Sequence, residues 1–145
     1  MRSILALALL FFAACTDGTQ AGAPEEPQQH LPRPFAPTFT LFVSNQSFDL
    51  PQVDIAVELD GQLAVSGDFL VEGQHTWIQF DFDLAPGSHQ LRVKSEDAGV
   101  TLDEAFDMDA RKWGVVNFWY HKAGSPEPTP EQFSFDLFDE APQFE

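Results

Sequence analysis

Apolar and polar residues alternate one by one along much of this chain, which is the period of a half-buried β-strand. The clearest run lies at 78–84, where Ile, Phe, Phe and Leu alternate with Gln, Asp and Asp. The runs 53–59, 90–94 and 133–137 alternate in the same way. No segment shows the one-sided apolar spacing of an amphipathic helix. The pattern therefore predicts an all-β protein.

Turn-forming residues separate these runs, at Asp60-Gly61, 85–87, 97–99 and 123–130. Asp-Gly between two alternating runs is a strong signal for a β-hairpin. Seven or eight short strands at such spacing are typical of a single antiparallel β-sandwich. The strands expected from the alternation and the turns are 38–43, 53–59, 62–71, 76–84, 88–95, 100–108, 113–121 and 133–139.

Two segments precede the β domain, which we expect at 38–145. Residues 1–14 hold Arg2 and a short apolar run, the pattern of a secretory signal peptide. The run is shorter than the roughly 20 apolar residues that a spanning helix needs. Residues 15–37 contain five prolines and no periodic apolar positions. This composition predicts a disordered, proline-rich linker.

Cys15 is the only cysteine, so it cannot form a disulfide within the chain. The residues Phe12-Ala13-Ala14-Cys15 resemble the lipobox of bacterial lipoproteins, although that family usually has Leu where Phe12 stands. The resemblance implies cleavage before Cys15 and acylation of the new amino terminus, with palmitate-like chains as the membrane anchor. Thr16 follows instead of the Asp typical of inner-membrane retention, which implies the outer membrane. The alternative is an ordinary cleaved signal peptide.

The segment 84–93, Leu-Ala-Pro-Gly-Ser-His-Gln-Leu-Arg-Val, follows an earlier Leu-Asp-Gly at 59–61. Together they resemble a turn and strand of bacterial immunoglobulin-like and PEGA-like surface domains. The resemblance implies an immunoglobulin-like β-sandwich module. It brings no activity with it.

The chain is strongly acidic, with 23 Asp and Glu against 7 Lys and Arg and a formal net charge of −16. Phosphate binding needs clustered basic side chains, so nucleic acid is excluded as a partner. Anionic lipid would also be repelled, so we expect membrane contact through the anchor alone. The charge could suit a cation or a basic partner, and simple solubility is the alternative interpretation.

Hydrolase and metal chemistry find little support in the sequence. There is no Gly-x-Ser-x-Gly motif, and Ser66 is expected to meet a histidine only by chance. His75, His89 and His121 could in principle bind zinc for a metal-assisted hydrolase, but they are expected on separate strands or at strand ends. We therefore predict no catalytic residue, no metal site and no cofactor.

Carboxylates recur two residues apart in the pairs Asp81/Asp83 and Asp107/Asp109. Such residues point to the same face of a strand, at about 7 Å separation. With a loop they could hold calcium, although the EF-hand pattern is missing. An acidic outer face is the favoured interpretation.

The aromatic residues provide the most specific candidates for binding. Trp77 falls in register with the polar positions of its strand, so it should point outward if Ile78 points inward. Trp119 shares a strand face with Asn117 and His121. Exposed aromatic rings beside amides and carboxylates can stack on sugar rings. The alternative is that both tryptophans fill the core or cover a sheet edge.

Taken together, the sequence predicts a lipid-anchored envelope protein with a non-catalytic binding or structural domain. A carbohydrate-binding module that uses Trp77 and Trp119 is the main alternative. A metal-assisted hydrolase is a third hypothesis. The identity of any protein or glycan partner does not follow from these patterns.

Overall fold

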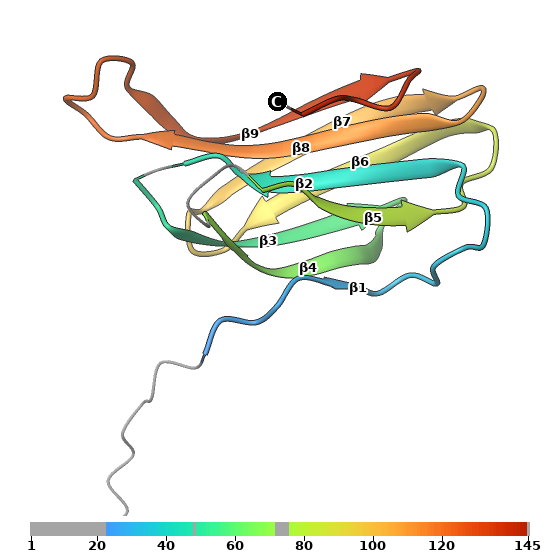
Figure 1. The fold of residues 1–145 in the computed structure, drawn as a ribbon, viewed down its shortest axis with the longest axis horizontal. Coiled ribbons are helices and arrows are strands. Elements are labelled where there is room, and N and C mark those ends of the chain that lie inside the picture. Colours follow the sequence, from blue (N-terminus) through green and yellow to red (C-terminus); the bar gives the residue numbers. More distant parts are fainter. Residues whose placement is uncertain (1–22, 48, 72–75, 145) are drawn as a thin grey trace, which may run out of the picture.

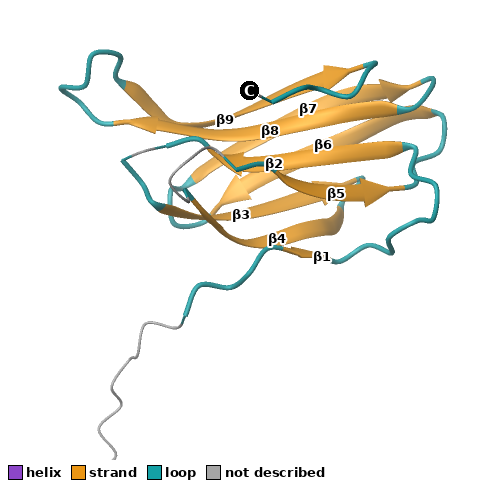
Figure 2. Ribbon diagram, viewed as in Figure 1, coloured by secondary structure: helices purple, strands orange, loops and turns teal. Residues whose placement is uncertain are grey.

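The computed structural model consists of two β-sheets packed face to face, as Figures 1 and 2 show. It describes residues 23–47, 49–71 and 76–144. These residues form nine strands and no helix, so the predicted all-β sandwich is confirmed. The same residues include no helix long and apolar enough to cross a membrane. The finer immunoglobulin-like type stays a prediction.

The first sheet has five strands, and all its neighbours pair antiparallel. Asp60 and Gly61 both have positive φ, 51° and 77°, which is the conformation of a type I′ turn. They join two of the strands as the predicted hairpin. In order across the sheet the strands are β1 (Gln28–Gln29), β4 (Gln62–Leu70), β3 (Gln52–Leu59), β6 (Gly87–Ser95) and β7 (Val100–Met108).

The second sheet has four strands and one parallel pair. Strand β2 pairs antiparallel with β5 but parallel with β8, with Phe39 opposite Lys112. The prediction of a fully antiparallel sandwich is therefore wrong at this pair. Alternation tells which residues share a face but not the direction of the neighbouring strand. Across the sheet the strands are β5 (Ile78–Phe82), β2 (Phe39–Asn45), β8 (Lys112–His121) and β9 (Thr129–Phe138).

The core lies between the inner faces of the two sheets. In β3 every second residue is buried, as the alternation predicts. Aromatic rings supply much of the filling: Phe39 stacks on Phe106 with centroids 5.1 Å apart, and Phe118 meets Phe133 edge-on at 5.4 Å. Burial of such rings is the main stabilising contribution of a sandwich core.

Residues 24–31, which we call the docked N-terminal segment, lie along β4 (Figure 1). The backbone N–H of Asp68 donates to Glu25 O at 2.7 Å, and the N–H of Glu25 donates to the Asp68 carboxylate at 2.7 Å. A Cβ placed on Gly67 would lie 2.6 Å from Pro27 Cα. Only glycine therefore leaves room for the segment at this point.

This arrangement corrects the predicted linker at 15–37 over residues 24–31, which pair with the edge of the folded domain. The segment binds through backbone groups at a sheet edge, which leaves no apolar period in the sequence. Gln29 adds a contact to the other sheet: its side-chain amide donates to Asp81 O at 2.8 Å and accepts from Asp81 N at 3.2 Å. The segment thus occupies part of the open edge of β5.

Candidate functional site: the outer face of the four-stranded sheet

Aromatic residues gather on the outer face of the four-stranded sheet, and we call four of them the aromatic face. In β8 the positions 113, 115, 117 and 119 point away from the core, because Gly114 faces the core rings of Phe39 and Phe135. Phe42 lies opposite Val115 in the neighbouring strand β2. The members of the aromatic face are Phe42, Trp77, Trp113 and Trp119.

Trp77 lies just before β5 and points to this outer face, as the alternation predicts. Its indole Nε1–H donates to Asn117 Oδ1 at 3.0 Å. Asn117 is in the central strand β8 and only 8% exposed. The Trp77 ring also stacks on Phe144, with centroids 4.3 Å apart and an interplanar angle of 14°. Trp77 is therefore half-buried, with its indole ring held in one orientation.

The other two tryptophans are also half-buried and have a partner each. Trp119 donates its Nε1–H to Ser134 Oγ at 3.0 Å, across the β8–β9 pair. The Arg111 guanidinium lies 4.8 Å from the centroid of the Trp113 ring, a cation–π contact. The structure thus brings the two predicted binding residues to one face, together with a third tryptophan that sequence reasoning had not singled out.

The C-terminal segment 139–144 covers part of this face. After β9 the chain turns back and runs along the sheet (Figure 1). Phe144 meets Phe42 edge-on, with centroids 5.0 Å apart, in addition to its stack on Trp77. Thr40 and Ser44 point outward from β2 but are 1% and 0% exposed. The face is therefore covered by aromatic side chains of its own and by the C-terminal segment.

The structure does not support the three-histidine metal site. His75 lies outside the described residues. His89 lies beside Phe106, and Phe106 stacks on Phe39, which is opposite the first residue of β8. His121 is the last residue of β8, so the two histidines lie near opposite ends of this strand. A ten-residue strand spans about 30 Å, so His89 and His121 cannot share a metal ion. Among the residues described, no group of three or more His, Cys, Asp or Glu side chains is arranged to hold one.

Instead, His89 has a structural role at the β3–β4 hairpin. Its Nδ1 lies 2.7 Å from Asp60 Oδ2 and its Nε2 lies 2.7 Å from Ala85 O. Burial alone lowers the pKa of His89, but the hydrogen bonds to Ala85 and Asp60 outweigh burial and raise it above the usual value. Both ring nitrogens face acceptors, so the protonated ring fits this position best.

Ser66 does meet a histidine, contrary to expectation. His30 Nε2 lies 2.7 Å from Ser66 Oγ, and His30 is exposed. Sequence reasoning missed this pair because His30 belongs to the segment predicted as linker. Within the described part of the chain, no carboxylate bonds to the other ring nitrogen of His30, as a catalytic triad would require. The contact ties β1 to β4 on the outer surface of the five-stranded sheet.

One carboxylate of each predicted pair is engaged by donors of the protein itself. Asp81 accepts hydrogen bonds from Thr40 Oγ1 at 3.0 Å, Gln79 Nε2 at 3.0 Å and Arg33 at 3.1 Å. Burial alone raises the pKa of Asp81. The hydrogen bonds from Gln79, Thr40 and Arg33 outweigh burial, so the pKa lies below the usual value. In the second pair, Asp109 forms an ion pair with Lys112.

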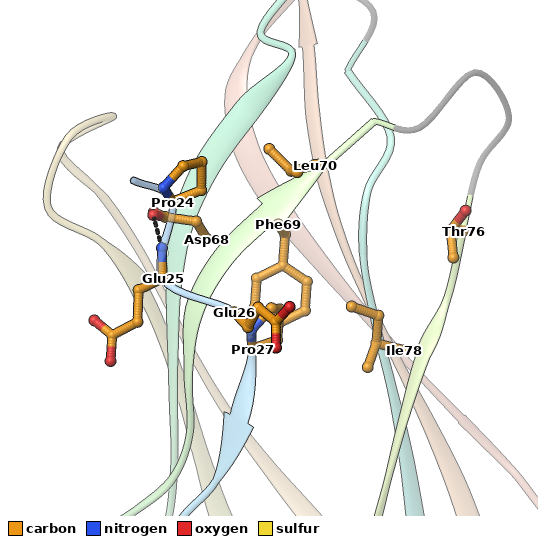
Figure 3. Close-up of a pocket in the computed structure, with 9 residues that line it drawn as sticks. All are labelled: Pro24, Glu25, Glu26, Pro27, Asp68, Phe69, Leu70, Thr76 and Ile78. Carbon is orange, nitrogen blue, oxygen red and sulfur yellow. Dashed lines mark hydrogen bonds between the residues drawn. The ribbon is translucent and has the colours of Figure 1, made fainter. Parts of the chain in front are cut away.

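A cavity of about 300 Å³ lies where the docked N-terminal segment meets β4 and the start of β5 (Figure 3). Its wall combines proline rings from the segment with apolar side chains such as Phe69 and Ile78, and Glu25 and Asp68 lie at its side. None of the residues proposed from the sequence for binding lines it. The aromatic face is therefore the stronger candidate site.

The fold and this face define a two-sheet, all-β sandwich with an aromatic outer surface. No protein-family model matches the chain, and no curated protein or solved structure matches it either. Cys15 and the expected signal peptide at 1–14 lie outside the described residues.

Proposed function

We propose that this protein is a lipid-anchored protein of the bacterial envelope and that its β-sandwich binds a partner without catalysing a reaction. Thr16, in place of the Asp typical of inner-membrane retention, supports the outer membrane as its location. The aromatic face carries this proposal. Trp77 and Trp119 lie on one sheet face, and each indole is oriented by a hydrogen bond, to Asn117 and to Ser134.

Oriented tryptophans are well suited to binding. An indole supplies a large contact area and is often an energetic hot spot of an interface. A side chain that is already fixed loses less conformational entropy when a partner covers it. The net charge of −16 favours a neutral or basic partner over an anionic one.

The anchor part of the proposal rests on the lipobox resemblance at Cys15. Because residues 24–31 are docked, the tether between lipid and domain runs only from Cys15 to about residue 23. Nine extended residues reach about 30 Å at most. The sandwich would therefore stay close to the membrane surface, with its aromatic face available to a partner near that surface.

The anchor is tested by fractionation and mass spectrometry of the full chain expressed in a bacterial host. We expect an acylated amino-terminal peptide that begins at Cys15, in the outer-membrane fraction. Cys15→Ser should move the protein to the soluble fraction. An unmodified thiol, or an unchanged location of the Cys15→Ser variant, would contradict the proposal.

Binding at the aromatic face is tested by photo-crosslinking in cells. A photoreactive phenylalanine at Phe138, which lies opposite Trp113 and is 40% exposed, should give a discrete adduct. The same group at Phe35, which is fully exposed outside the strands, is the control. Absence of an adduct from Phe138, or equal adducts from both positions, would overturn a binding role for this face.

The carbohydrate-binding alternative is favoured by the same two tryptophans and needs its own test. Purified protein is sedimented with insoluble peptidoglycan and cellulose, and titrated with soluble oligosaccharides. Retention that is lost in Trp119→Ala but kept in Phe35→Ala would support sugar binding. Lack of retention on every glycan would exclude this alternative for the glycans tested.

A further inference from the structure

The Trp77 end of the aromatic face forms a site for one aromatic ring. Phe144 lies there, stacked on Trp77 at 4.3 Å and 14°, and edge-on to Phe42 at 5.0 Å and 73°. Both are favourable geometries for aromatic pairs. The ring is not sealed in, since Phe144 keeps 38% exposure.

The chain that carries Phe144 is held mainly by that ring. Its base is fixed, because the Lys112 ammonium forms an ion pair with Asp139. Beyond Asp139, the described residues 140–144 make no hydrogen bond or ion pair with the rest of the described chain. They form no strand, and Pro142 lies among them. The segment is therefore an occupant of the face and not a part of the sheet.

The site itself belongs to the sheet and does not depend on this segment. Asn117 in β8 orients the Trp77 indole through Nε1, and Phe42 is fixed by its place in the central strand β2. Removal of Phe144 would leave both rings in position. A different aromatic side chain could then take its place.

We propose that the Trp77–Phe42 site binds an aromatic side chain carried on an extended segment of a partner polypeptide, and that residues 139–144 occupy this site in the free protein. The inference rests on the proposed binding role of the aromatic face and names the partner class. Phe144 shows what the site accepts: a flat ring on an irregular, proline-containing peptide.

Charge indicates how a partner displaces the segment. The C-terminal segment carries Asp139 and Glu140, which contribute to the formal net charge of −16 of the chain. Lys112 attracts Asp139 locally. The net negative charge of the domain repels Glu140, but it attracts a partner peptide with Lys or Arg beside its aromatic residue. A partner needs this electrostatic advantage, because the tethered segment competes for the Trp77–Phe42 site at millimolar effective concentration.

The experiment follows the three indole N–H signals of the full chain by two-dimensional NMR. The probes are a synthetic peptide with the sequence of residues 139–145, the same peptide with Lys in place of its acidic residues, and a version of each with Ala in place of Phe. The proteins are wild type, Phe144→Ala and, as a matched control, Phe35→Ala. Circular dichroism and melting curves establish that each variant is folded.

We expect the lysine peptide to shift the Trp77 signal, with at least tenfold tighter binding to Phe144→Ala than to wild type. Phe35→Ala should behave as wild type, and the peptides with Ala should not bind. In the Phe144→Ala background, Trp77→Phe keeps a stacking ring and should keep peptide binding, whereas Trp77→Ala should lose it; because both variants lack the Trp77 signal, their binding is followed through the signals of the peptide.

Equal affinity for wild type and Phe144→Ala, or no peptide binding to folded Phe144→Ala, would overturn the inference. A gain of oligosaccharide binding without peptide binding would also overturn it, in favour of sugar stacking at the same ring. The proposed function fails separately, through the crosslink from Phe138, which lies at the other end of the face. A crosslink from Phe138 without peptide binding at Trp77 would leave the binding role of the aromatic face intact. It would refute only the inference that the Trp77–Phe42 site binds an aromatic side chain of a partner.

Discussion

Replacement of Trp77 by alanine separates the possible roles of this side chain by magnitude. The change removes the hydrogen bond to Asn117, the stack on Phe144 and the partial burial of the ring. An acceptor left without its donor costs about 1–3 kcal/mol. The lost ring stack adds about 1 kcal/mol.

Together these two losses predict a decrease of about 2–4 kcal/mol in the free energy of unfolding. For a domain of this size that corresponds to a fall of about 10–15 °C in melting temperature. The centre of this range, about 3 kcal/mol, lies at the lower end of the 3–5 kcal/mol typical of a fully buried aromatic residue. The domain should stay folded, since stabilities of 5–15 kcal/mol are usual.

Thermal and urea unfolding of Trp77→Ala, Trp77→Phe and Phe35→Ala provide the test. Trp77→Phe keeps a ring on Phe144 and loses only the hydrogen bond, so its loss should be about half as large. Phe35→Ala should change nothing, because that ring is fully exposed. An unchanged melting temperature for Trp77→Ala would refute the packing described for this ring. A decrease of more than about 5 kcal/mol in the free energy of unfolding of Trp77→Ala would show that Trp77 is a core residue.

Three further predictions concern the parts of the fold that support the aromatic face. Gly67→Ala places a methyl group against Pro27, so the docked N-terminal segment should lose amide protection in hydrogen exchange while the sheets keep theirs; retained protection would contradict the close approach. The raised pKa of His89 means that its stabilising contribution is complete below the unfolded value of 6.5 and is lost as pH rises through the folded pKa. Its partner Asp60 has a lowered pKa, so that contribution is present above the unfolded value of 3.8 and is lost as pH falls through the folded pKa. Urea unfolding across pH should lose the slope above pH 6.5 in His89→Gln, whereas the acid slope should weaken without vanishing, because the Gln90 N–H still donates to Asp60; identical profiles of wild type and variant would refute the pairing. Gly114→Ala overfills the core and should cost about 1–3 kcal/mol in the same assay, and an unchanged midpoint would show that the neighbouring rings can move aside.

The strands were predictable because burial of one face makes apolar and polar residues alternate along the sequence with a period of two. Expected strand 53–59 corresponds to β3 at Gln52–Leu59, and the Asp60-Gly61 hairpin lies where predicted. The outward direction of Trp77 followed from the same alternation. Pairing partners were not predictable, because the face pattern of β2 is equally compatible with a parallel and an antiparallel neighbour.

Contacts made through backbone groups or through single residues were not predictable, because they produce no periodic pattern in the sequence. Strand β1 is Gln-Gln and docks by main-chain hydrogen bonds at a sheet edge, so its sequence resembles that of a linker. The pair of His30 and Ser66 depends on that docking. Phe144 follows the last strand with no periodicity around it, and its role becomes visible only when the chain turns back over Trp77.

The parallel pair of β2 and β8 has a consequence for the time course of folding. Its partners are 73 residues apart in the chain, and they form the two central strands of their sheet. Such non-local pairing is characteristic of domains that fold in milliseconds to seconds. A nascent chain that lacks β8 leaves β2 and β5 without the neighbour that completes their sheet. The sandwich should therefore assemble only after the C-terminal third has been synthesised, so the chain would stay without its completed fold until then.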